Sequence, residues 1–309
     1  MSIKRKDLLG LDGVSREEIS EILDMAMTMR QIVRSSNKKT PHLQGKSIVT
    51  LFYENSTRTR MSFELASKYM SAAAANISAS ASSVAKGETL IDTGVTLDQM
   101  GTDVIIIRHP MSGAPALLAK NVKAHVINAG DGMNEHPTQA LLDMMTMRDH
   151  LGSLDGIKVA ICGDVMHSRV ARSNIYGLTT MGAEVVLCAP PTLIPVEIEK
   201  LGCKVAPTIE DACENADVVM GLRIQRERQQ KGLFPSVAEY CDNWEITPDR
   251  VALAKKHALV MHPGPMNRGV EIASSAADCA QSVITQQVES GVCVRMALLY
   301  MLTRREGQA

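Results

Sequence analysis

Residues 47–66 read SIVTLFYENSTRTRMSFELA, which places an apolar run directly before a polar and basic turn. The run 47–53 has the composition of a buried strand, and the segment from Ser56 onward has that of a helix. The first turn of a helix leaves backbone N–H groups unpaired and carries the positive end of the helix dipole. Ser and Thr add hydroxyl donors there, and Arg adds a planar fork suited to phosphate. This strand-to-helix turn predicts an anion site in an α/β fold.

The residues alone leave two interpretations of this turn open. Ser56 can be an ordinary helix N-cap, with Glu64 and Lys68 solvated on the following helix. A lone Ser-Thr pair favours that interpretation. Two arginines within three positions, Arg58 and Arg60, favour phosphate binding instead.

A second polar motif, His136-Pro137-Thr138-Gln139, opens an apolar segment that predicts a helix ending near Leu151. His136 could donate a hydrogen bond to a carbonyl oxygen that gains negative charge, and Gln139, one turn on, could accept from an NH2 group. A single histidine on a helix is usually a cap or a core group, so this interpretation depends on His136 and Gln139 together.

Composition limits the classes of function. Thirty-three Lys and Arg residues nearly cancel thirty-four Asp and Glu residues, so we expect no general attraction to nucleic acid or to a membrane. Seven scattered cysteines without a Cys-x-x-Cys pair predict reduced thiols, no zinc and no disulfide in a cytoplasmic protein. The basic N-terminus is not followed by an apolar signal segment, and no apolar run reaches membrane-spanning length.

Length and hydrophobic patterning predict the architecture. The chain has 309 residues, which favours two domains of about 150 residues each. Strands and helices alternate in a βα pattern, which predicts parallel sheets flanked by helices. Ser15 and Glu18 resemble a capping box for an early amphipathic helix. The predicted strands are 47–53, 103–108, 124–128, 158–162, 184–188, 204–205, 217–220 and 258–261.

Residues 52–64 and 136–139 resemble the carbamoyl-phosphate and carbamoyl-binding motifs of the aspartate and ornithine carbamoyltransferases, and the resemblance extends from about Asp7 to Arg305. It implies a carbamoyl-phosphate-binding domain of residues 1–135 plus 292–309 and an aspartate-binding domain of residues 136–291. The last helix, from about 292 to 303, is expected to pack back on the first domain.

The resemblance also implies which residues bind carbamoyl phosphate. They are Ser56, Thr57, Arg58, Thr59, Arg108, His136, Gln139, Ser82, Lys86, Gly264 and Pro265. Arg58, Thr59, Arg108, His136 and Lys86 are expected to be catalytic, chiefly by electrostatic stabilisation and positioning. Taken alone, Arg108 would be an ordinary surface arginine, but it ends an apolar predicted strand, where ligands of α/β proteins bind.

The acceptor is expected to be L-aspartate, bound by Lys86, Arg169, Arg223 and Gln225, with a mobile lid formed by the polar segment after Arg223. Ornithine enzymes carry His-Cys-Leu-Pro and Ser-Met-Gly segments, whereas this chain reads His-Pro-Gly-Pro at 262–265 and has several arginines at 223–228. Those arginines suit a second carboxylate. Gly264 departs from the leucine of some aspartate enzymes.

Lys86, with Ser82 four residues earlier, resembles a loop that a neighbouring subunit inserts into the active site. This implies a homotrimer with shared active sites. Without the other motifs, Lys86 would be an exposed lysine on a turn.

The expected reaction is transfer of the carbamoyl group from carbamoyl phosphate to L-aspartate in de novo pyrimidine (UMP) synthesis, without a cofactor or a metal. The segment 158–180 lacks the Gly-x-Gly-x-x-Gly spacing of a dinucleotide site, so NAD is not expected. Alternatives are transfer to ornithine or another amino acid, and a non-catalytic scaffold. Association with a regulatory chain or another pyrimidine enzyme stays open.

Overall fold

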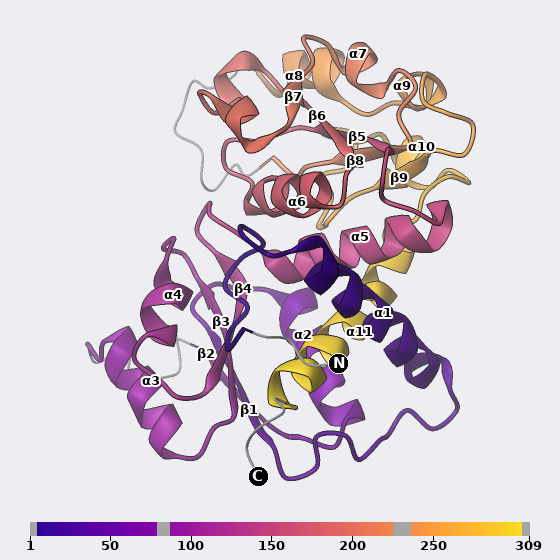
Figure 1. Cartoon of the computed structure of the whole chain (residues 1–309). Coiled ribbons are helices and arrows are strands. Elements are labelled where there is room, and N and C mark those ends of the chain that lie inside the picture. The colour runs from indigo at the N-terminus through magenta and orange to yellow at the C-terminus, as the bar shows by residue number, and fades with distance from the viewer. Residues whose placement is uncertain (1–4, 79–86, 225–235, 305–309) are drawn as a thin grey trace. The chain divides into compact units, whose positions relative to one another are not determined.

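The structure is a computed structural model that describes residues 5–78, 87–224 and 236–304. The chain forms two compact units, one of Met1–Met145 with Val288–Ala309 and one of Thr146–Gln287. Each unit is built on a parallel sheet flanked by helices (Figure 1), so the predicted α/β class is confirmed. The divisions fall inside two continuous helices, whereas the sequence analysis placed them at 135/136 and 291/292. Hydrophobic periodicity marks where a helix begins, but not where along the helix its packing partners change.

The sheet of the first unit has the strand order β2-β1-β3-β4, and all its neighbouring strands are parallel. Strands β1, β3 and β4 are almost entirely buried, as expected for a covered parallel sheet, whereas the edge strand β2 is mostly exposed. The strands are β1 (Ser47–Phe52), β2 (Ala73–Ser78), β3 (Val104–His109) and β4 (His125–Asp131).

Helices cover both faces of this sheet. Leu97 and Leu118, on two helices of one face, pack with Leu51 and Ile105 in one buried cluster. Figure 1 shows α3 and α4 on that side and α2 on the other. The helices that lie wholly or partly in this unit are α1 (Arg16–Arg34), α2 (Thr57–Tyr69), α3 (Leu90–Gln99), α4 (Ala114–Ala119), α5 (Pro137–Leu151) and α11 (Ile284–Thr303).

The sheet of the second unit has the order β7-β6-β5-β8-β9, again all parallel. Figure 1 shows α6 on one face and α7 to α9 on the other, where Ile209 and Val251 pack against Ala160 and Val219. The strands are β5 (Lys158–Cys162), β6 (Glu184–Cys188), β7 (Lys204–Val205), β8 (Val218–Gly221) and β9 (Leu259–Met261). The helices are α6 (Arg169–Thr180), η3 (Pro191–Leu193), η4 (Ile198–Leu201), α7 (Ile209–Cys213), α8 (Val237–Trp244), α9 (Pro248–Ala252) and α10 (Ser274–Ala277).

Three local features differ from the expectations. Strand β2 was not predicted, and α11 begins at Ile284, eight residues before the predicted start at 292. Ser15 caps α1 by accepting from the Glu18 N–H at 3.2 Å, but the Glu18 carboxylate binds the Arg5 guanidinium at 2.6 and 2.9 Å. For that carboxylate, a charged guanidinium is a stronger hydrogen-bond donor than a single backbone N–H.

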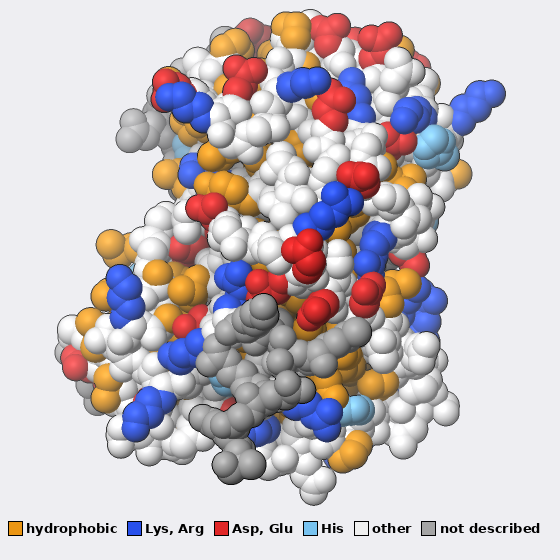
Figure 2. All heavy atoms as spheres, viewed as in Figure 1, with side chains coloured by type: hydrophobic (Ala, Val, Ile, Leu, Met, Phe, Trp, Pro, Cys, Tyr) orange, Lys and Arg blue, Asp and Glu red, His pale blue; other side chains and the backbone are white. Residues whose placement is uncertain are grey.

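Surface charge follows the balanced composition. Figure 2 shows acidic and basic side chains mixed over the visible face of each unit, in keeping with the formal net charge of −1. None of the described helices is both long enough and apolar enough to cross a membrane.

Candidate active site

The N-terminus of α2 differs from those of the other described helices for which a Ser or Thr N-cap is recorded. Ser56 has extended backbone geometry, with φ −158° and ψ 102°, but its side chain makes no capping hydrogen bond within the described chain. The first turn of α2 also contains no acidic residue. By contrast, the side chains of six other Ser or Thr N-caps each accept a hydrogen bond from the first turn of their helix. These are Ser15, Thr89, Ser168, Thr208, Ser236 and Thr247.

The side chain at the N-cap position of α2 is therefore not used for capping within the described chain. Thr57 and Arg58 are exposed, whereas Thr59 is buried and its carbonyl accepts from the Ser62 hydroxyl at 3.0 Å. Exposed N–H, hydroxyl and guanidinium groups at the positive end of a thirteen-residue helix are suited to an anion. The ordinary capping interpretation of Ser56 does not describe this helix.

Arg108 lies beside the same turn. It sits on β3 opposite Phe52 of β1, and its carbonyl accepts from the Tyr53 N–H at 2.8 Å. Its guanidinium Nη1 donates to the Ala129 carbonyl at 3.1 Å, and Nε lies 3.5 Å from Oε2 of Glu54. Parallel register thus brings the predicted phosphate turn and Arg108 to one edge of the first sheet.

His136 and Gln139 occupy the start of α5 in the same unit. The His136 side chain is buried at 4% exposure, and the Thr138 hydroxyl lies 3.5 Å from its Nδ1. Nε2 of Gln139 donates to Oδ1 of Asp143 at 2.9 Å. Because an ionised carboxylate only accepts, this bond orients the Gln139 amide and turns its carbonyl oxygen the other way. Gln139 can therefore act as an acceptor, as predicted for the carbamoyl NH2.

In the second unit, the two arginines that are predicted to bind the carboxylates of aspartate follow neighbouring strands. Arg169 is buried at the start of α6, the element that follows β5, and the half-buried Arg223 follows β8. Strands β5 and β8 pair in parallel, so both residues lie beyond the carboxyl edge of the second sheet. Gly163 permits the close approach of the two connections, because a Cβ there would lie 2.7 Å from the Leu222 carbonyl oxygen.

The 262–265 segment leaves β9 at the same edge of this sheet. Gly264 has φ +62°, in the left-handed region that favours glycine, and its N–H donates to Nδ1 of His262 at 2.8 Å. The peptide bond between Gly264 and Pro265 is cis. The positive φ gives a physical reason for the glycine where some aspartate enzymes have leucine.

Comparison with known proteins agrees with this geometry. Residues 6–149 match the family model of the aspartate/ornithine carbamoyltransferase, carbamoyl-P binding domain. Residues 155–302 match that of the aspartate/ornithine carbamoyltransferase, Asp/Orn binding domain. The chain belongs to the aspartate/ornithine carbamoyltransferase family.

Relatives of known name cover the whole chain. The aspartate carbamoyltransferase catalytic subunit of Ruminiclostridium cellulolyticum is 68% identical over 99% of this chain and 97% of its own length. That of Acetivibrio thermocellus is 66% identical over 99% and 98%. The Trypanosoma cruzi aspartate transcarbamoylase, solved with carbamoyl aspartate and phosphate, is 32% identical with a TM-score of 0.87 and coverages of 96% and 95%.

An ornithine enzyme of the family has the same fold. The ornithine carbamoyltransferase of Pyrococcus furiosus is 30% identical to this chain, with a TM-score of 0.86 over 97% of this chain and 98% of its own. Backbone architecture therefore does not distinguish aspartate enzymes from ornithine enzymes within this family. The choice of acceptor amino acid depends on side chains beyond the second sheet.

Three predicted site residues of this carbamoyltransferase, Ser82, Lys86 and Gln225, lie outside the described residues, as does most of the predicted lid. Sequence reasoning also missed several polar residues of the site. Glu54 and Asp143 approach Arg108 and Gln139, and Asp164 accepts from the His167 ring at 2.8 Å, just before Arg169. Glu54 lies inside the 52–64 motif. A negative charge close in sequence to Arg58 and Arg60 could have indicated that it belongs to the site.

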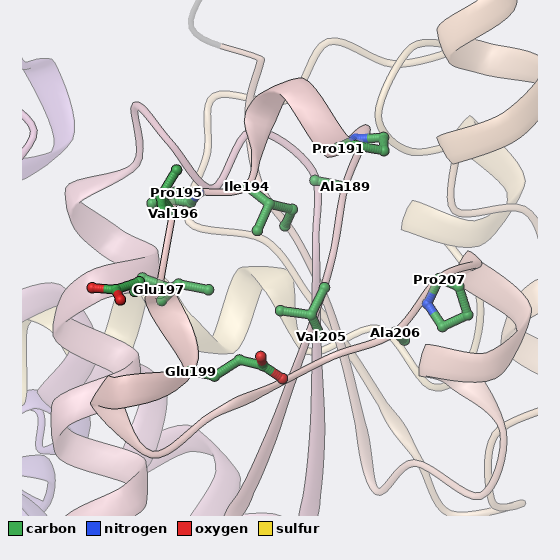
Figure 3. A pocket seen from close by; sticks show the side chains of 11 residues that line it. Ala189, Pro191, Ile194, Pro195, Val196, Glu197, Glu199, Val205, Ala206 and Pro207 are labelled. Atoms are coloured by element: carbon green, nitrogen blue, oxygen red, sulfur yellow. The ribbon is translucent and has the colours of Figure 1, made fainter.

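The second unit of this carbamoyltransferase also carries a surface groove of about 380 Å³ near strands β6 and β7 (Figure 3). Ile194 and Val205 line its apolar part, and Glu197 and Glu199 contribute carboxylates. None of the predicted site residues that the structure describes lines it. Within the described residues, no group of three or more His, Cys, Asp or Glu side chains could hold a metal ion, and all seven cysteines are free thiols.

Proposed function

We propose that this chain is an aspartate carbamoyltransferase. It transfers the carbamoyl group of carbamoyl phosphate to the amino group of L-aspartate, giving N-carbamoyl-L-aspartate and phosphate. This is the carbamoylation step of de novo pyrimidine (UMP) synthesis. The observation that carries the proposal within the structure is the N-terminus of α2, where Ser56 is placed as an N-cap but its side chain does not cap the described helix.

The phosphate group of the first substrate binds at this turn. Backbone N–H groups of Thr57 and Thr59, the hydroxyls of Ser56 and Thr57, and the Arg58 guanidinium supply the donors. These groups carry partial or full positive charge, and the first turn of α2 contains no carboxylate that would repel a dianion. Carbamoyl phosphate is therefore bound through its phosphate, which is the leaving group of the reaction.

The carbamoyl group is bound and polarised by residues of β3 and α5. Arg108, Thr59 and His136 donate to the carbonyl oxygen as it gains charge in the tetrahedral intermediate. Gln139 accepts from the NH2 group, and its bond to Asp143 at 2.9 Å supports that orientation. Preorganised donors of this kind stabilise the transition state more than the ground state.

The amine of aspartate attacks the carbamoyl carbon, forming a C–N bond. The C–O bond to phosphate then breaks, and phosphate leaves with the electron pair and takes the amine proton. This balance needs no metal, cofactor or covalent enzyme intermediate. Positioning and electrostatics are the contribution of the protein.

Arg169 and Arg223, with Gln225, bind the two carboxylates of aspartate. Their position beyond neighbouring strands β5 and β8 supports this assignment, since guanidinium groups form bidentate pairs with carboxylates. The ornithine alternative requires a partner for an ammonium group where these arginines stand. We also propose that Gly264 and Pro265 contribute to carbamoyl phosphate binding through the backbone of their loop.

A homotrimer in the cytoplasm is the proposed working form, with Ser82 and Lys86 donated to the active site of a neighbouring subunit. A basic residue from a neighbour would complete the charge balance around a dianionic leaving group. Cyclic assembly supplies one such residue to each site. Binding of a regulatory chain or another pyrimidine enzyme is compatible with this proposal but is not needed for it.

The test is a steady-state assay with carbamoyl phosphate and a panel of amines. We expect product with L-aspartate and none with L-ornithine. Calorimetry with N-(phosphonacetyl)-L-aspartic acid, which joins both anionic parts, should show far tighter binding than L-aspartate alone. Turnover of ornithine but not aspartate, or binding of the analogue no tighter than aspartate, would contradict the assignment.

A further inference from the structure

A buried arginine lies behind the residues that bind the carbamoyl group. Arg295 is on α11, its side chain is 3% exposed, and it belongs to the same unit as His136 and Gln139. Burial lowers the pKa of its guanidinium to about 9, and the Asp143 carboxylate opposes that change. A buried cation is costly, so its contacts need an explanation beyond packing.

The guanidinium of Arg295 joins three helices. Its carbon lies 5.0 Å from the ring centroid of Phe63, which is fully buried on α2. Nη1 donates to the Gly291 carbonyl on α11 at 3.0 Å, and Nη2 lies 3.4 Å from the Thr138 hydroxyl on α5. These contacts link the helix that begins at the phosphate turn to the helix that begins at His136.

The Thr138 contact bears on the protonation of His136. Arg295 can only donate hydrogen bonds, so the Thr138 oxygen accepts from Arg295. The hydroxyl proton of Thr138 is then available to another acceptor. Nδ1 of His136 lies 3.5 Å from that hydroxyl. If Nδ1 accepts, the ring proton of a neutral His136 is on Nε2, and Nε2–H is the donor that a carbonyl oxygen requires.

The Asp143 contact bears on Gln139 in the same way. Asp143 is fully buried, accepts from Nε2 of Gln139 at 2.9 Å, and interacts electrostatically with Arg295. The positive charge of Arg295 complements an ionised Asp143, and an ionised carboxylate only accepts hydrogen bonds. The Gln139 amide then has one orientation, with its carbonyl oxygen available to NH2.

The guanidinium of Arg295 lies close to the backbone at Gly291. A Cβ at this position would lie 2.6 Å from Nη1 of Arg295 and 3.2 Å from Cδ2 of Leu142. The first contact is far below any real Cβ distance. A methyl group at Gly291 would displace the guanidinium without removing it.

We propose that Arg295 is a positioning residue for carbamoyl transfer, which acts through Thr138 and Asp143 to fix the tautomer of His136 and the amide orientation of Gln139. This inference rests on the proposed function. Arg295 itself is not assigned any contact with substrate.

The first test compares Arg295→Met with Arg304→Met. Arg304 is exposed directly after the same helix, and its guanidinium carbon lies 4.8 Å from the Tyr300 ring, so it controls for the loss of an arginine stacked on a ring. We expect kcat of Arg295→Met to fall about 10²-fold, because small misplacements of catalytic donors have effects of this size. Inorganic phosphate should bind with unchanged affinity, measured by calorimetry. Arg304→Met should retain wild-type kcat.

The second test observes His136 directly. Selective ¹⁵N labelling of histidine, with the signals assigned by their loss in His136→Asn, reports which ring nitrogen carries the proton. We expect the Nε2–H tautomer in the wild-type chain and a mixture in Arg295→Met and Thr138→Val. A purely structural Arg295 would lower the melting temperature without changing this signature.

Further variants keep the test decisive if Arg295→Met does not fold. Gly291→Ala retains the cation but displaces it, and should lower kcat and shift the His136 signals in the same direction. Arg295→Lys retains the charge facing Asp143 and should recover part of the lost kcat. Unchanged kcat and an unchanged tautomer in the folded variants would overturn the proposal. Absence of turnover in the wild-type chain would count against the proposed function instead, since the tautomer is measured without turnover.

Discussion

His262 and Glu271 form a buried pair behind the Gly264 loop: Nε2 of His262 lies 3.4 Å from Oε1 of Glu271, and neither side chain is more than 1% exposed. The Gly264 N–H donates to Nδ1 of the same histidine, so the ring proton is on Nε2 and faces the carboxylate. Glu271 also accepts from the backbone N–H and the side-chain amide of Asn267. One carboxylate therefore holds both the histidine and the loop.

Glu271→Ala should destabilise the chain by about 3 kcal/mol, because it removes the acceptor of two part-buried Asn267 donors and the buried carboxylate that faces His262. Urea unfolding followed by circular dichroism measures this. Asp278→Ala is the matched control, since that carboxylate pairs with Arg268 at the surface, where ion pairs contribute little. Equal stability of the two variants would show that the buried pair does not support the loop.

Arg58→Ala should lower kcat by roughly 10²–10³-fold while the chain stays folded, because a charge-assisted contact to the leaving group is lost. Arg60→Ala is the control. Arg60 is also exposed, lies two positions further along α2 and is not assigned to the site. Steady-state kinetics with saturating aspartate distinguish the two. Near-normal turnover of Arg58→Ala would remove Arg58 from the mechanism.

Arg223→Ala should raise the KM for aspartate strongly and leave phosphate binding unchanged, since this arginine is assigned to the second substrate. Arg172→Ala, a change at a partly exposed arginine of α6, should leave both unchanged. Initial rates over a matrix of both substrates give the two KM values. Equal weakening for both substrates would contradict the assignment of Arg223.

Much of this fold could be predicted because it is encoded locally. The strands 158–162 and 184–188 coincide with β5 and β6, since continuous apolar runs between polar turns are typical of parallel strands. Strand β2 escaped prediction because Ala73–Ser78 reads AAANIS, with little β-branched content, and is a strand through its pairing with β1.

The site also has one part that could be predicted from local sequence and another part that only the structure reveals. The hydroxyls and arginines of 56–60 stand next to one another in the sequence, so their shared turn was predictable. Arg295 and Thr138 are 157 residues apart, and only folding brings the guanidinium to the hydroxyl. The orientation of Gln139 also required the structure, because Asp143 on the next turn could equally have faced solvent.

Asp217 should make stability depend on pH. Burial raises the pKa of this carboxyl. Hydrogen bonds from the Lys158 N–H, the Lys255 ammonium and the His257 ring lower the pKa by more than burial raises it, so the net pKa is below its ordinary value. A depressed folded-state pKa contributes stability that is present above the unfolded value, about 4, and is lost as pH falls through the folded value.

Urea unfolding of the wild-type chain and of Asp217→Asn at a series of pH values tests this. The free energy of unfolding should fall more steeply below about pH 4 in the wild-type chain than in the variant. Asp155→Asn, a change at an exposed carboxylate in the same unit, serves as the control. Parallel curves for all three chains would mean that Asp217 is not a source of acid sensitivity.

The proposed sharing of Lys86 across a subunit interface predicts complementation between two inactive variants. Lys86→Ala and His136→Ala should each be inactive alone. After mixed dissociation and reassembly, every cyclic heterotrimer has one interface where an intact His136 meets an intact Lys86 from its neighbour, so activity should reappear. Each chain carries only one of the two intact residues, so self-contained sites could not recover. Verified mixed trimers that stay inactive would exclude a shared active site.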